Sequence, residues 1–154
     1  MDLEIVVPLL PCMSKLREKS EFNLSAAETL LKETLYAPSV HCSYYSCFQL
    51  LKYTIKEFSG EDYDTQAANI SATQQKTHQY VINYICNELI RFEGIEGSRK
   101  FKHKIKDLKQ YRVESDYEDV EVSLDKGEQA LRLAQEIRRY MIEKFNVWIH
   151  KILS

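Results

Sequence analysis

Glycine and proline are scarce in this sequence, since its 154 residues include only 4 Gly and 3 Pro. Folds made of many short strands need many turns, and turns are rich in these two residues, so a β-sandwich or barrel is disfavoured. Hydrophobic residues make up 44% of the chain and charged residues 29%, an ordinary balance for a globular protein. At this length the simplest organisation is one domain with its own core.

Cysteine is also infrequent, and its spacing excludes the common zinc and redox motifs. No two cysteines form a Cys-x-x-Cys pair, and none has a histidine partner at the spacing of zinc ligands. We therefore expect free thiols in a reducing compartment, no metal site and no cofactor. The four cysteines are Cys12, Cys42, Cys47 and Cys86.

Long hydrophobic runs are absent as well, so no segment is expected to span a membrane. The chain begins with acidic residues and a short apolar stretch that Pro8 and Pro11 interrupt, whereas a signal peptide has a basic start and a longer apolar run. We expect an extended arm over residues 1–13, followed by a single helical domain over residues 14–154. The protein is expected to be cytoplasmic.

The motifs of several enzyme classes are missing. The sequence has no glycine-rich phosphate loop, no His-Glu-x-x-His and no repeated Glu-x-x-His. It also has no nucleophile elbow and no cysteine-protease signature, which argues against an orthodox hydrolase. The four histidines are scattered, and their intervals give no evidence of a shared site. They are His41, His78, His103 and His150.

Helical periodicity dominates what is present. Residues 38–58 are apolar or aromatic nearly all round, as expected for a central helix, and Gly60 suits the left-handed residue that ends it. In the first helix, Phe22 belongs to a rough apolar stripe, and the polar stretch 61–73 is expected to be a loop. The predicted fold class is all-α, an antiparallel up-and-down bundle of four to five helices, at about residues 14–36, 38–58, 74–92, 99–111 and from 123 onward.

A basic helix follows a short break bracketed by Gly94 and Gly97, with Ser98 as its expected N-cap. From residue 99 to residue 112, seven lysines and arginines stand against Asp107 as the sole acid. The net charge of the whole chain is -2, so any contact with a polyanion must come from such a local patch. Three interpretations stay open: a solvated helix face, a docking surface for an acidic protein, or a contact with RNA phosphates.

The stretch from Leu108 to Tyr117 closes this basic segment. Arg112 is followed four and five positions later by Asp116 and Tyr117, so the three lie near one side of a helix if the helix continues that far. An arginine, a carboxylate and a phenol gathered at a helix end could bind phosphate. The alternative is an ion pair that closes the bundle, worth under about 1 kcal/mol if it is exposed.

Three segments together resemble one family. Residues 40–49, Val-His-Cys-Ser-Tyr-Tyr-Ser-Cys-Phe-Gln, are similar to the Tyr-Tyr-small-x-Phe-His core of HEPN domains (higher eukaryotes and prokaryotes nucleotide-binding). Residues 76–78, Lys-Thr-His, resemble the start of the third helix in a bacterial and archaeal branch of that family. Residues 111–117 resemble its Arg-x-x-(Ala/Ser)-Asp-Tyr signature, and residues 130–141 resemble its alanine-bearing last helix. The segments occur in family order over roughly residues 20–143.

This resemblance implies a helical bundle that commonly dimerises and that pairs with minimal nucleotidyltransferases. Many members of the family are metal-independent RNases in which an Arg-x(4–6)-His motif carries out the chemistry, so the resemblance also implies this activity. Carried onto this sequence, the arginine is Arg112 and the histidine position falls at Tyr117, and a free phenol with a pKa of about 10 is a poor base at neutral pH. Cys42 and Gln49 also stand where the branch often has arginine and histidine.

The leading hypothesis is therefore a HEPN-like, dimeric nucleotide- or RNA-binding or regulatory module. It would act beside a nucleotidyltransferase in a toxin–antitoxin, defence or mobile-element system. One alternative is a metal-independent endoribonuclease that uses Arg112 with Tyr117 or with a histidine from elsewhere, and Arg99 with His103 is another pair at suitable spacing. A further alternative is a structural docking partner of an acidic protein. The residues selected for binding are Tyr44, Tyr45, His78, Lys109, Arg112, Asp116 and Tyr117.

Overall fold

Five α-helices and no strand make up the part of the chain that the structure describes. The computed structural model describes residues 15–146, so the expected arm over residues 1–13 and the end of the last predicted helix lie outside the described residues. The all-α class predicted from the sequence is confirmed. The helices are α1 (Lys15–Lys32), α2 (Tyr36–Ser59), α3 (Tyr63–Thr73), α4 (Thr77–Tyr117) and α5 (Leu124–Phe145).

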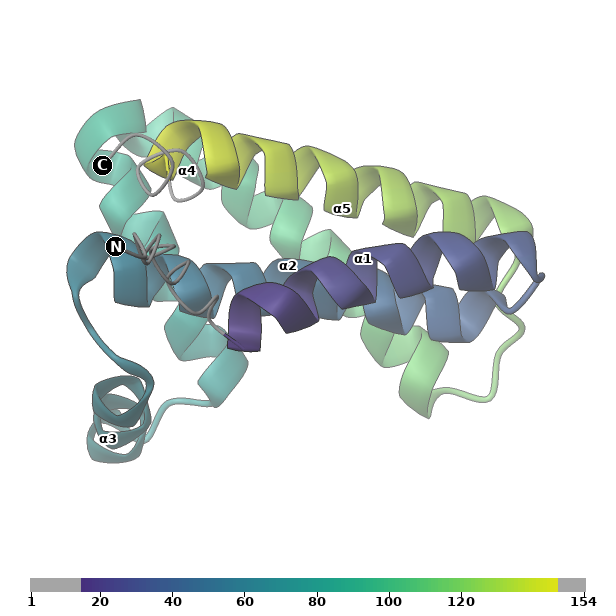
Figure 1. The fold of residues 1–154 in the computed structure, drawn as a ribbon, viewed down its shortest axis with the longest axis horizontal. Coiled ribbons are helices and arrows are strands. Elements are labelled where there is room, and N and C mark those ends of the chain that lie inside the picture. Colours follow the sequence, from purple (N-terminus) through teal and green to yellow (C-terminus); the bar gives the residue numbers. More distant parts are fainter. Residues whose placement is uncertain (1–14, 147–154) are drawn as a thin grey trace, which may run out of the picture.

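Four long segments pack side by side in the bundle. α4 has two helical parts, one before and one after Gly94. α1 and the second part of α4 run in one direction, whereas α2 and α5 run in the opposite direction (Figure 1). α2 is the central helix, as its apolar sequence predicts, because it packs against α1, α4 and α5. It ends at Gly60, which has the expected left-handed conformation (φ 72°) and donates its N–H to the carbonyl of Lys56 at 3.0 Å.

α1 docks onto α2 through small and polar side chains. Its buried residues are Ser20 and Ala27. Phe22, which the sequence analysis placed in a rough apolar stripe, is 69% exposed and does not pack in the core. Ser20 Oγ donates to the carbonyl of Ser46 at 2.7 Å, and Ser39 Oγ donates to the carbonyl of Ala27 at 2.7 Å. Small residues let the two backbones approach closely, and the serine hydroxyls then bond to the backbone of the facing helix.

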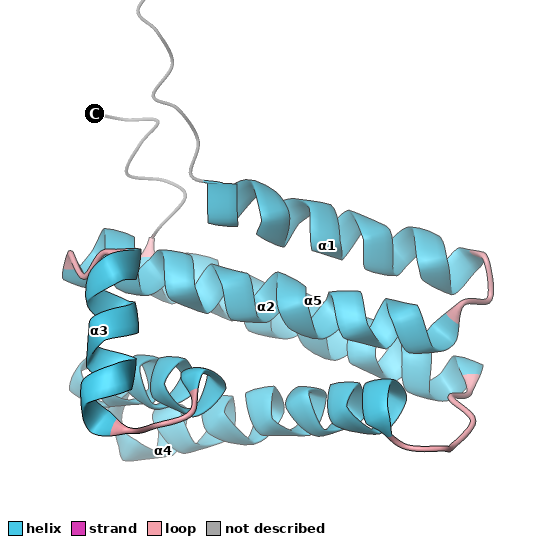
Figure 2. Ribbon diagram, turned by 90° about the horizontal axis from the view of Figure 1, so that it is seen from below, coloured by secondary structure: helices cyan, strands magenta, loops and turns pink. Residues whose placement is uncertain are grey.

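The stretch 61–73, predicted to be a loop, contains the short helix α3. Figures 1 and 2 show α3 lying across one end of the bundle rather than along it. The Asp62 carboxylate caps α3 by accepting a hydrogen bond from the N–H of Thr65 at 2.8 Å. The buried side chain of Gln66 donates to two backbone carbonyls at 3.2 and 2.9 Å. Polar side chains hold this helix in place, which is why its composition resembles that of a loop.

α4 folds back on itself at Gly94. This residue has φ 74° and ψ 176° between two helical parts, a conformation that favours glycine. The predicted break therefore exists, but it is confined to one residue. Ser98 is not the predicted N-cap, because the helix resumes before it. Its buried Oγ instead donates to the carbonyl of Cys86 at 2.7 Å and joins the two parts of α4.

α5 begins at a polar cap and passes close to the connection between α1 and α2. Its N-cap is Ser123, whose Oγ accepts a hydrogen bond from the N–H of Lys126 at 3.1 Å. A Cβ on Gly127 would lie 2.8 Å from Leu31 Cδ1 and 3.6 Å from the side chain of Tyr36. Close packing thus accounts for a glycine in the first turns of a helix, where it costs about 1 kcal/mol relative to alanine.

Candidate functional site

The two ends of α4 meet against the first half of α2. Because α4 reverses at Gly94, His78 from its start and Arg112 from near its end both contact Tyr44 of α2. The structure thereby brings together the seven residues that the sequence selects for binding, with His41 and Phe48 added. We call this group the Arg112 site: His41, Tyr44, Tyr45, Phe48, His78, Lys109, Arg112, Asp116 and Tyr117.

Arg112 lies among aromatic rings and has N–H groups to spare. Its guanidinium carbon is 5.1, 5.6 and 5.7 Å from the ring centres of Tyr44, Tyr45 and Tyr117, within the range of cation–π contacts. Its Nη1 is 3.8 Å from the Asp116 carboxylate, which is too long for a hydrogen bond. Its Nε is buried and has no hydrogen-bond partner among residues 15–146. The side chain is only 7% exposed, so this is a desolvated cation with unused donors.

Asp116 links Arg112 to His41, a residue that the sequence analysis did not select. His41 Nδ1 lies 2.8 Å from Asp116 Oδ2, the oxygen that also faces Arg112. Its ring centre is 4.6 Å from that of Tyr45. A carboxylate at one nitrogen orients an imidazole and leaves the other nitrogen for proton exchange. The available signal was its position three and four residues before Tyr44 and Tyr45, on the same helix face.

His78 and Tyr44 form a second hydrogen-bonded pair. The phenol oxygen is 2.6 Å from His78 Nδ1, and the His78 ring stacks on Phe48 with ring centres 4.2 Å apart. Burial, followed by the charges of neighbouring cations, lowers the pKa of His78 from 6.5 to about 4. Burial likewise raises the pKa of Tyr44 well above its ordinary value of 10.0, although the charge of Arg112 acts in the opposite direction. Both groups are therefore uncharged at neutral pH.

The charges around His78 are mostly positive. The cations that lower its pKa are Arg112, Lys109 and Lys52. The pKa of Lys109 is itself lowered, first by burial and then by other cations that include Arg112. The carboxylate of Asp116 faces one of these cations, Arg112, at 3.8 Å. The site therefore has an excess of positive charge that a bound anion would offset.

The lowered pKa of His78 predicts a stability that depends on pH. Below its ordinary pKa of 6.5 the unfolded chain binds a proton at His78, whereas the folded chain stays neutral there until about pH 4. The contribution of His78 to stability is thus complete above pH 6.5 and is lost as the pH falls toward 4. Because the ring is in partial contact with solvent, we expect a loss of about 1–2 kcal/mol, below the roughly 3 kcal/mol of the full shift.

Urea unfolding at about pH 7 and about pH 4.5 measures this loss. His78→Gln should reduce the difference in unfolding free energy between the two pH values by that amount, and His103→Gln, which removes an exposed histidine of α4, should not. Equal pH dependence in the wild type and in His78→Gln would contradict a proton-excluding environment at His78.

Arg99 and His103, the second arginine–histidine pair that the sequence suggests for RNA cleavage, lie elsewhere on α4. Arg99 is about 20 Å along the helix from Arg112, given the rise per residue. Its guanidinium pairs with Glu96 at 3.7 Å, and His103 is exposed. The structure therefore does not bring Arg99 and His103 to the Arg112 site.

The described part of the chain has no group of side chains suited to hold a metal ion, and its cysteines are free. No group of three or more His, Cys, Asp or Glu side chains between residues 15 and 146 could hold a metal ion. Cys42, Cys47 and Cys86 are free, and Cys12 lies outside the described residues. Burial raises the pKa of Cys47 to about 12, so this thiol is unreactive at neutral pH.

None of the five helices is long and apolar enough to cross a bilayer.

The sequence of this bundle matches one known family of domains. A family model described as "HEPN domain" matches residues 13–145. The chain belongs to the HEPN domain family. The family predicted from the sequence segments is thus confirmed, and HEPN domains are generally concerned with nucleotides or RNA and often form dimers. Comparison with curated proteins and with solved structures gives no match.

The three positions at which the resemblance predicts a departure from the family pattern have different surroundings. Tyr117, where the resemblance places the family histidine, is 75% exposed. Cys42 is half-buried, and burial followed by the charge of Asp116 raises its pKa. Gln49 accepts a hydrogen bond from Asn23 of α1 at 2.9 Å, so it contacts α1. Of these three departures, Tyr117 is the one in contact with Arg112.

Proposed function

We propose that this HEPN domain is a nucleotide- or RNA-binding module in which the Arg112 site holds a phosphate group. The observation that carries the proposal is the guanidinium of Arg112, which is buried, has an unpartnered Nε and lies 3.8 Å from its carboxylate neighbour. A buried cation without a close acceptor is costly. A phosphate oxygen would supply that acceptor and would be attracted by Lys109 and Lys52 as well.

Tyr117 controls access to this guanidinium. It is the last residue of α4, and its ring lies over Arg112 although the residue is 75% exposed. Because this ring is so exposed and lies at a helix end, it can rotate away from Arg112 and let a phosphate reach the guanidinium. Its face would then be free to stack on a base, an interaction worth about 1–3 kcal/mol in single-strand binding proteins. Asp116 would keep its contact with His41 while Arg112 turns to the ligand.

Binding of a labelled single-stranded RNA, followed by fluorescence anisotropy over a range of salt, tests this function. We expect affinity to fall as salt rises, with a slope that corresponds to about two or three phosphate contacts, and no cleavage of the RNA. Competition by a nucleoside monophosphate distinguishes a mononucleotide site from an RNA site. If neither RNA nor mononucleotide binds at low salt, the proposal is wrong.

The expected partners of this protein are inferred from its family alone. The homodimer, the nucleotidyltransferase partner and the toxin–antitoxin, defence or mobile-element setting stay predictions, as does the cytoplasmic location. Sedimentation velocity at micromolar concentration addresses the first of them. A species of only 18.1 kDa would contradict the homodimer.

A second candidate function is metal-independent RNA cleavage, which the contact between His41 and Asp116 favours. In such a reaction the arginine stabilises charge on the phosphate, and a histidine moves the proton of the 2′-hydroxyl or of the leaving oxygen. Tyr117 occupies the family position of that histidine. His41 is 45% exposed, and its Nδ1 contacts the Asp116 carboxylate, which also faces Arg112. It could therefore replace the missing histidine.

RNA cleavage in the presence of EDTA tests this alternative. If the wild type cleaves, His41→Ala and Arg112→Gln should each lower the rate by about 100-fold or more, whereas His103→Ala should leave it unchanged. Loss of cleavage in Tyr117→Phe, with activity retained in His41→Ala, would instead assign the proton transfer to Tyr117. A wild-type protein that binds RNA without cleaving it excludes the alternative.

A further inference from the structure

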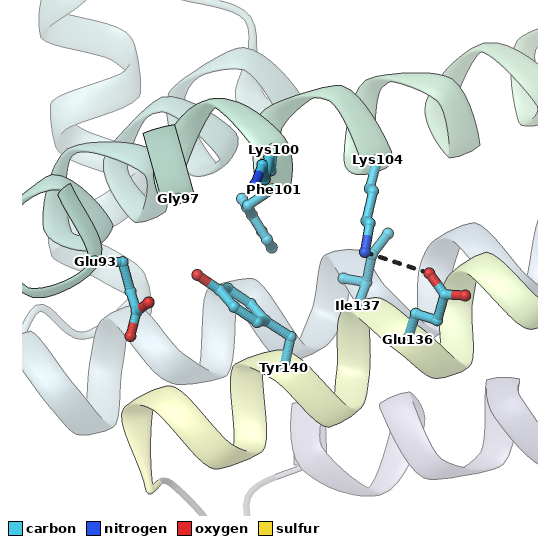
Figure 3. A pocket seen from close by; sticks show the side chains of 8 residues that line it. All are labelled: Glu93, Gly97, Lys100, Phe101, Lys104, Glu136, Ile137 and Tyr140. Atoms are coloured by element: carbon cyan, nitrogen blue, oxygen red, sulfur yellow. Dashed lines mark ion pairs between the residues drawn. The ribbon is translucent and has the colours of Figure 1, made fainter. Parts of the chain in front are cut away.

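A pocket between the second part of α4 and α5 contains no residue of the Arg112 site. Its volume is about 280 Å³, and Figure 3 shows side chains from both helices around it. A dry cavity of about 150 Å³ can bind benzene, so this one has room for a single ring with a substituent. The residues that matter for the argument are Gly97, Lys100 and Phe101 on α4, and Ile137 and Tyr140 on α5.

The Tyr140 hydroxyl is a polar group without a partner in this pocket. Its oxygen is buried and makes no hydrogen bond to any residue between 15 and 146, and Figure 3 shows it pointing from α5 toward α4. Burial, followed by the charge of Glu93, raises the pKa of Tyr140, so the hydroxyl keeps its proton and can donate it. Gly97 lies at the same wall: a Cβ there would be in ordinary contact with Tyr140 Oη at 3.8 Å but only 2.9 Å from Glu93 Cβ, so close packing against Glu93 favours glycine at this position.

The inner wall of the pocket is apolar. Phe101 is 3% exposed and Ile137 is 1% exposed. The rings of Phe101 and Tyr140 are nearly parallel, with an angle of 24° and ring centres 5.9 Å apart. Aromatic and aliphatic side chains therefore form the apolar part of the pocket, where a flat apolar group could pack.

The charges at the rim leave one cation unpaired. Lys104 pairs with Glu136 at 3.4 Å, as the dashed line in Figure 3 shows, and Lys144 pairs with Glu93 at 2.8 Å. Lys100 lines the pocket and forms no ion pair within the described chain. An unpaired ammonium and an unpartnered hydroxyl donor at one apolar pocket suit a ligand that is apolar at one end and anionic at the other.

We propose that this pocket binds a small molecule with one aromatic ring and one anionic group. The ring packs on Phe101 and Ile137, and the anion accepts a hydrogen bond from Tyr140 and faces Lys100. A carboxylate and a phosphate share this chemistry. The proposal does not depend on RNA or nucleotide binding at the Arg112 site.

NMR titration of the isotope-labelled full-length protein with benzoate, phenyl phosphate and neutral benzyl alcohol tests the proposal. We expect an anionic probe to bind with a Kd of about 1 mM or tighter, and benzyl alcohol to bind about tenfold more weakly. Backbone shifts should concentrate near residues 97–104 and 137–140. The tighter of the two anions identifies the carboxylate or the phosphate class.

Two variants separate this pocket from the rest of the surface. Lys100→Ala and Tyr140→Phe should each weaken the anionic probe about fivefold to tenfold, because each removes one of its polar partners. Lys106→Ala, which removes an exposed lysine of the same helix outside the pocket, should have no effect. Arg112→Gln should likewise leave benzoate binding intact while it weakens RNA binding.

Three outcomes would overturn the proposal. The first is an absence of shifts at about 10 mM probe, far above the expected Kd, which would mean that the pocket holds only water. The second is binding that neither Lys100→Ala nor Tyr140→Phe weakens. The third is a set of benzoate shifts centred on the Arg112 site, with none near residues 97–104 and 137–140, which would show that the probe does not occupy this pocket.

Discussion

Replacing Arg138 by alanine should lower the free energy of unfolding by about 2–4 kcal/mol. Arg138 of α5 is 4% exposed. Its guanidinium donates to the carbonyl of Ser46 at 3.0 Å, to the Glu21 carboxylate at 2.8 Å and to Ser20 Oγ. These bonds hold α1 and α2 to α5 at a place where α1 buries only Ser20 and Ala27. Alanine would leave both a cavity and buried acceptors without their charged donor.

Urea unfolding of three variants measures this contribution. Arg139→Ala removes the exposed neighbouring arginine and should change the unfolding free energy by no more than about 0.5 kcal/mol. Arg138→Met restores volume without donors, so it should recover only part of the loss. An Arg138→Ala protein as stable as the wild type would show that other contacts attach α1 to the bundle.

Replacing Arg112 by glutamine should weaken RNA binding by about 10-fold to 100-fold, the range expected for a charge-assisted hydrogen bond to phosphate. The slope of affinity against salt should fall by about one, because one phosphate contact is lost. Arg112→Lys keeps the charge but lacks the planar donors and stacks less well between Tyr44 and Tyr45. It should therefore recover only part of the affinity.

The matched control is Arg132→Gln, which removes one positive charge from the exposed face of α5. It should change the affinity by less than about threefold, the effect of general electrostatics alone. Unfolding curves of Arg112→Gln establish that the variant is folded under the binding conditions. Equal weakening in Arg112→Gln and Arg132→Gln would mean that Arg112 makes no specific contact with the ligand.

The bundle could be predicted because its causes are local. The apolar segment 38–58 and Gly60 carry their signals in adjacent residues, and α2 follows them closely. α3 could not be predicted in the same way. Its cap by Asp62 is visible in the sequence, but the buried bonds of Gln66 go to the carbonyls of Lys52 and Glu61, and no short-range pattern reveals such contacts.

The break in α4 was predictable and its geometry was not. Gly94 and Gly97 mark an interruption, but only the structure shows that Gly94 alone makes the reversal while Ser98 lies inside a helix. That reversal is what brings Arg112 back beside Tyr44, where His78 from the start of α4 also lies. Because the path of the chain decides the neighbours, the sequence could select these side chains from family motifs without giving their distances.

His41 shows the same limit within the Arg112 site. Its spacing from Tyr45 was readable as one helix face, but its partner Asp116 is 75 residues away in the sequence. A family motif that looks for a histidine shortly after the arginine cannot find one that a different helix provides. The selection of Tyr117 from that motif stays a prediction.

The most direct test of phosphate binding at Arg112 follows the protonation of His78 by NMR, with and without the RNA oligonucleotide. A pKa of about 4 leaves about one tenth of the His78 rings protonated at about pH 5. Burial is the larger cause of this low pKa, and the charges of Arg112, Lys109 and Lys52 add to it. A phosphate bound beside Arg112 and Lys109 would offset the part that comes from these charges. We expect the protonated fraction to rise to about half or more when RNA is bound. RNA that binds while the His78 titration stays unchanged would place the phosphate elsewhere, for example on the basic part of α4, and would contradict the proposed site.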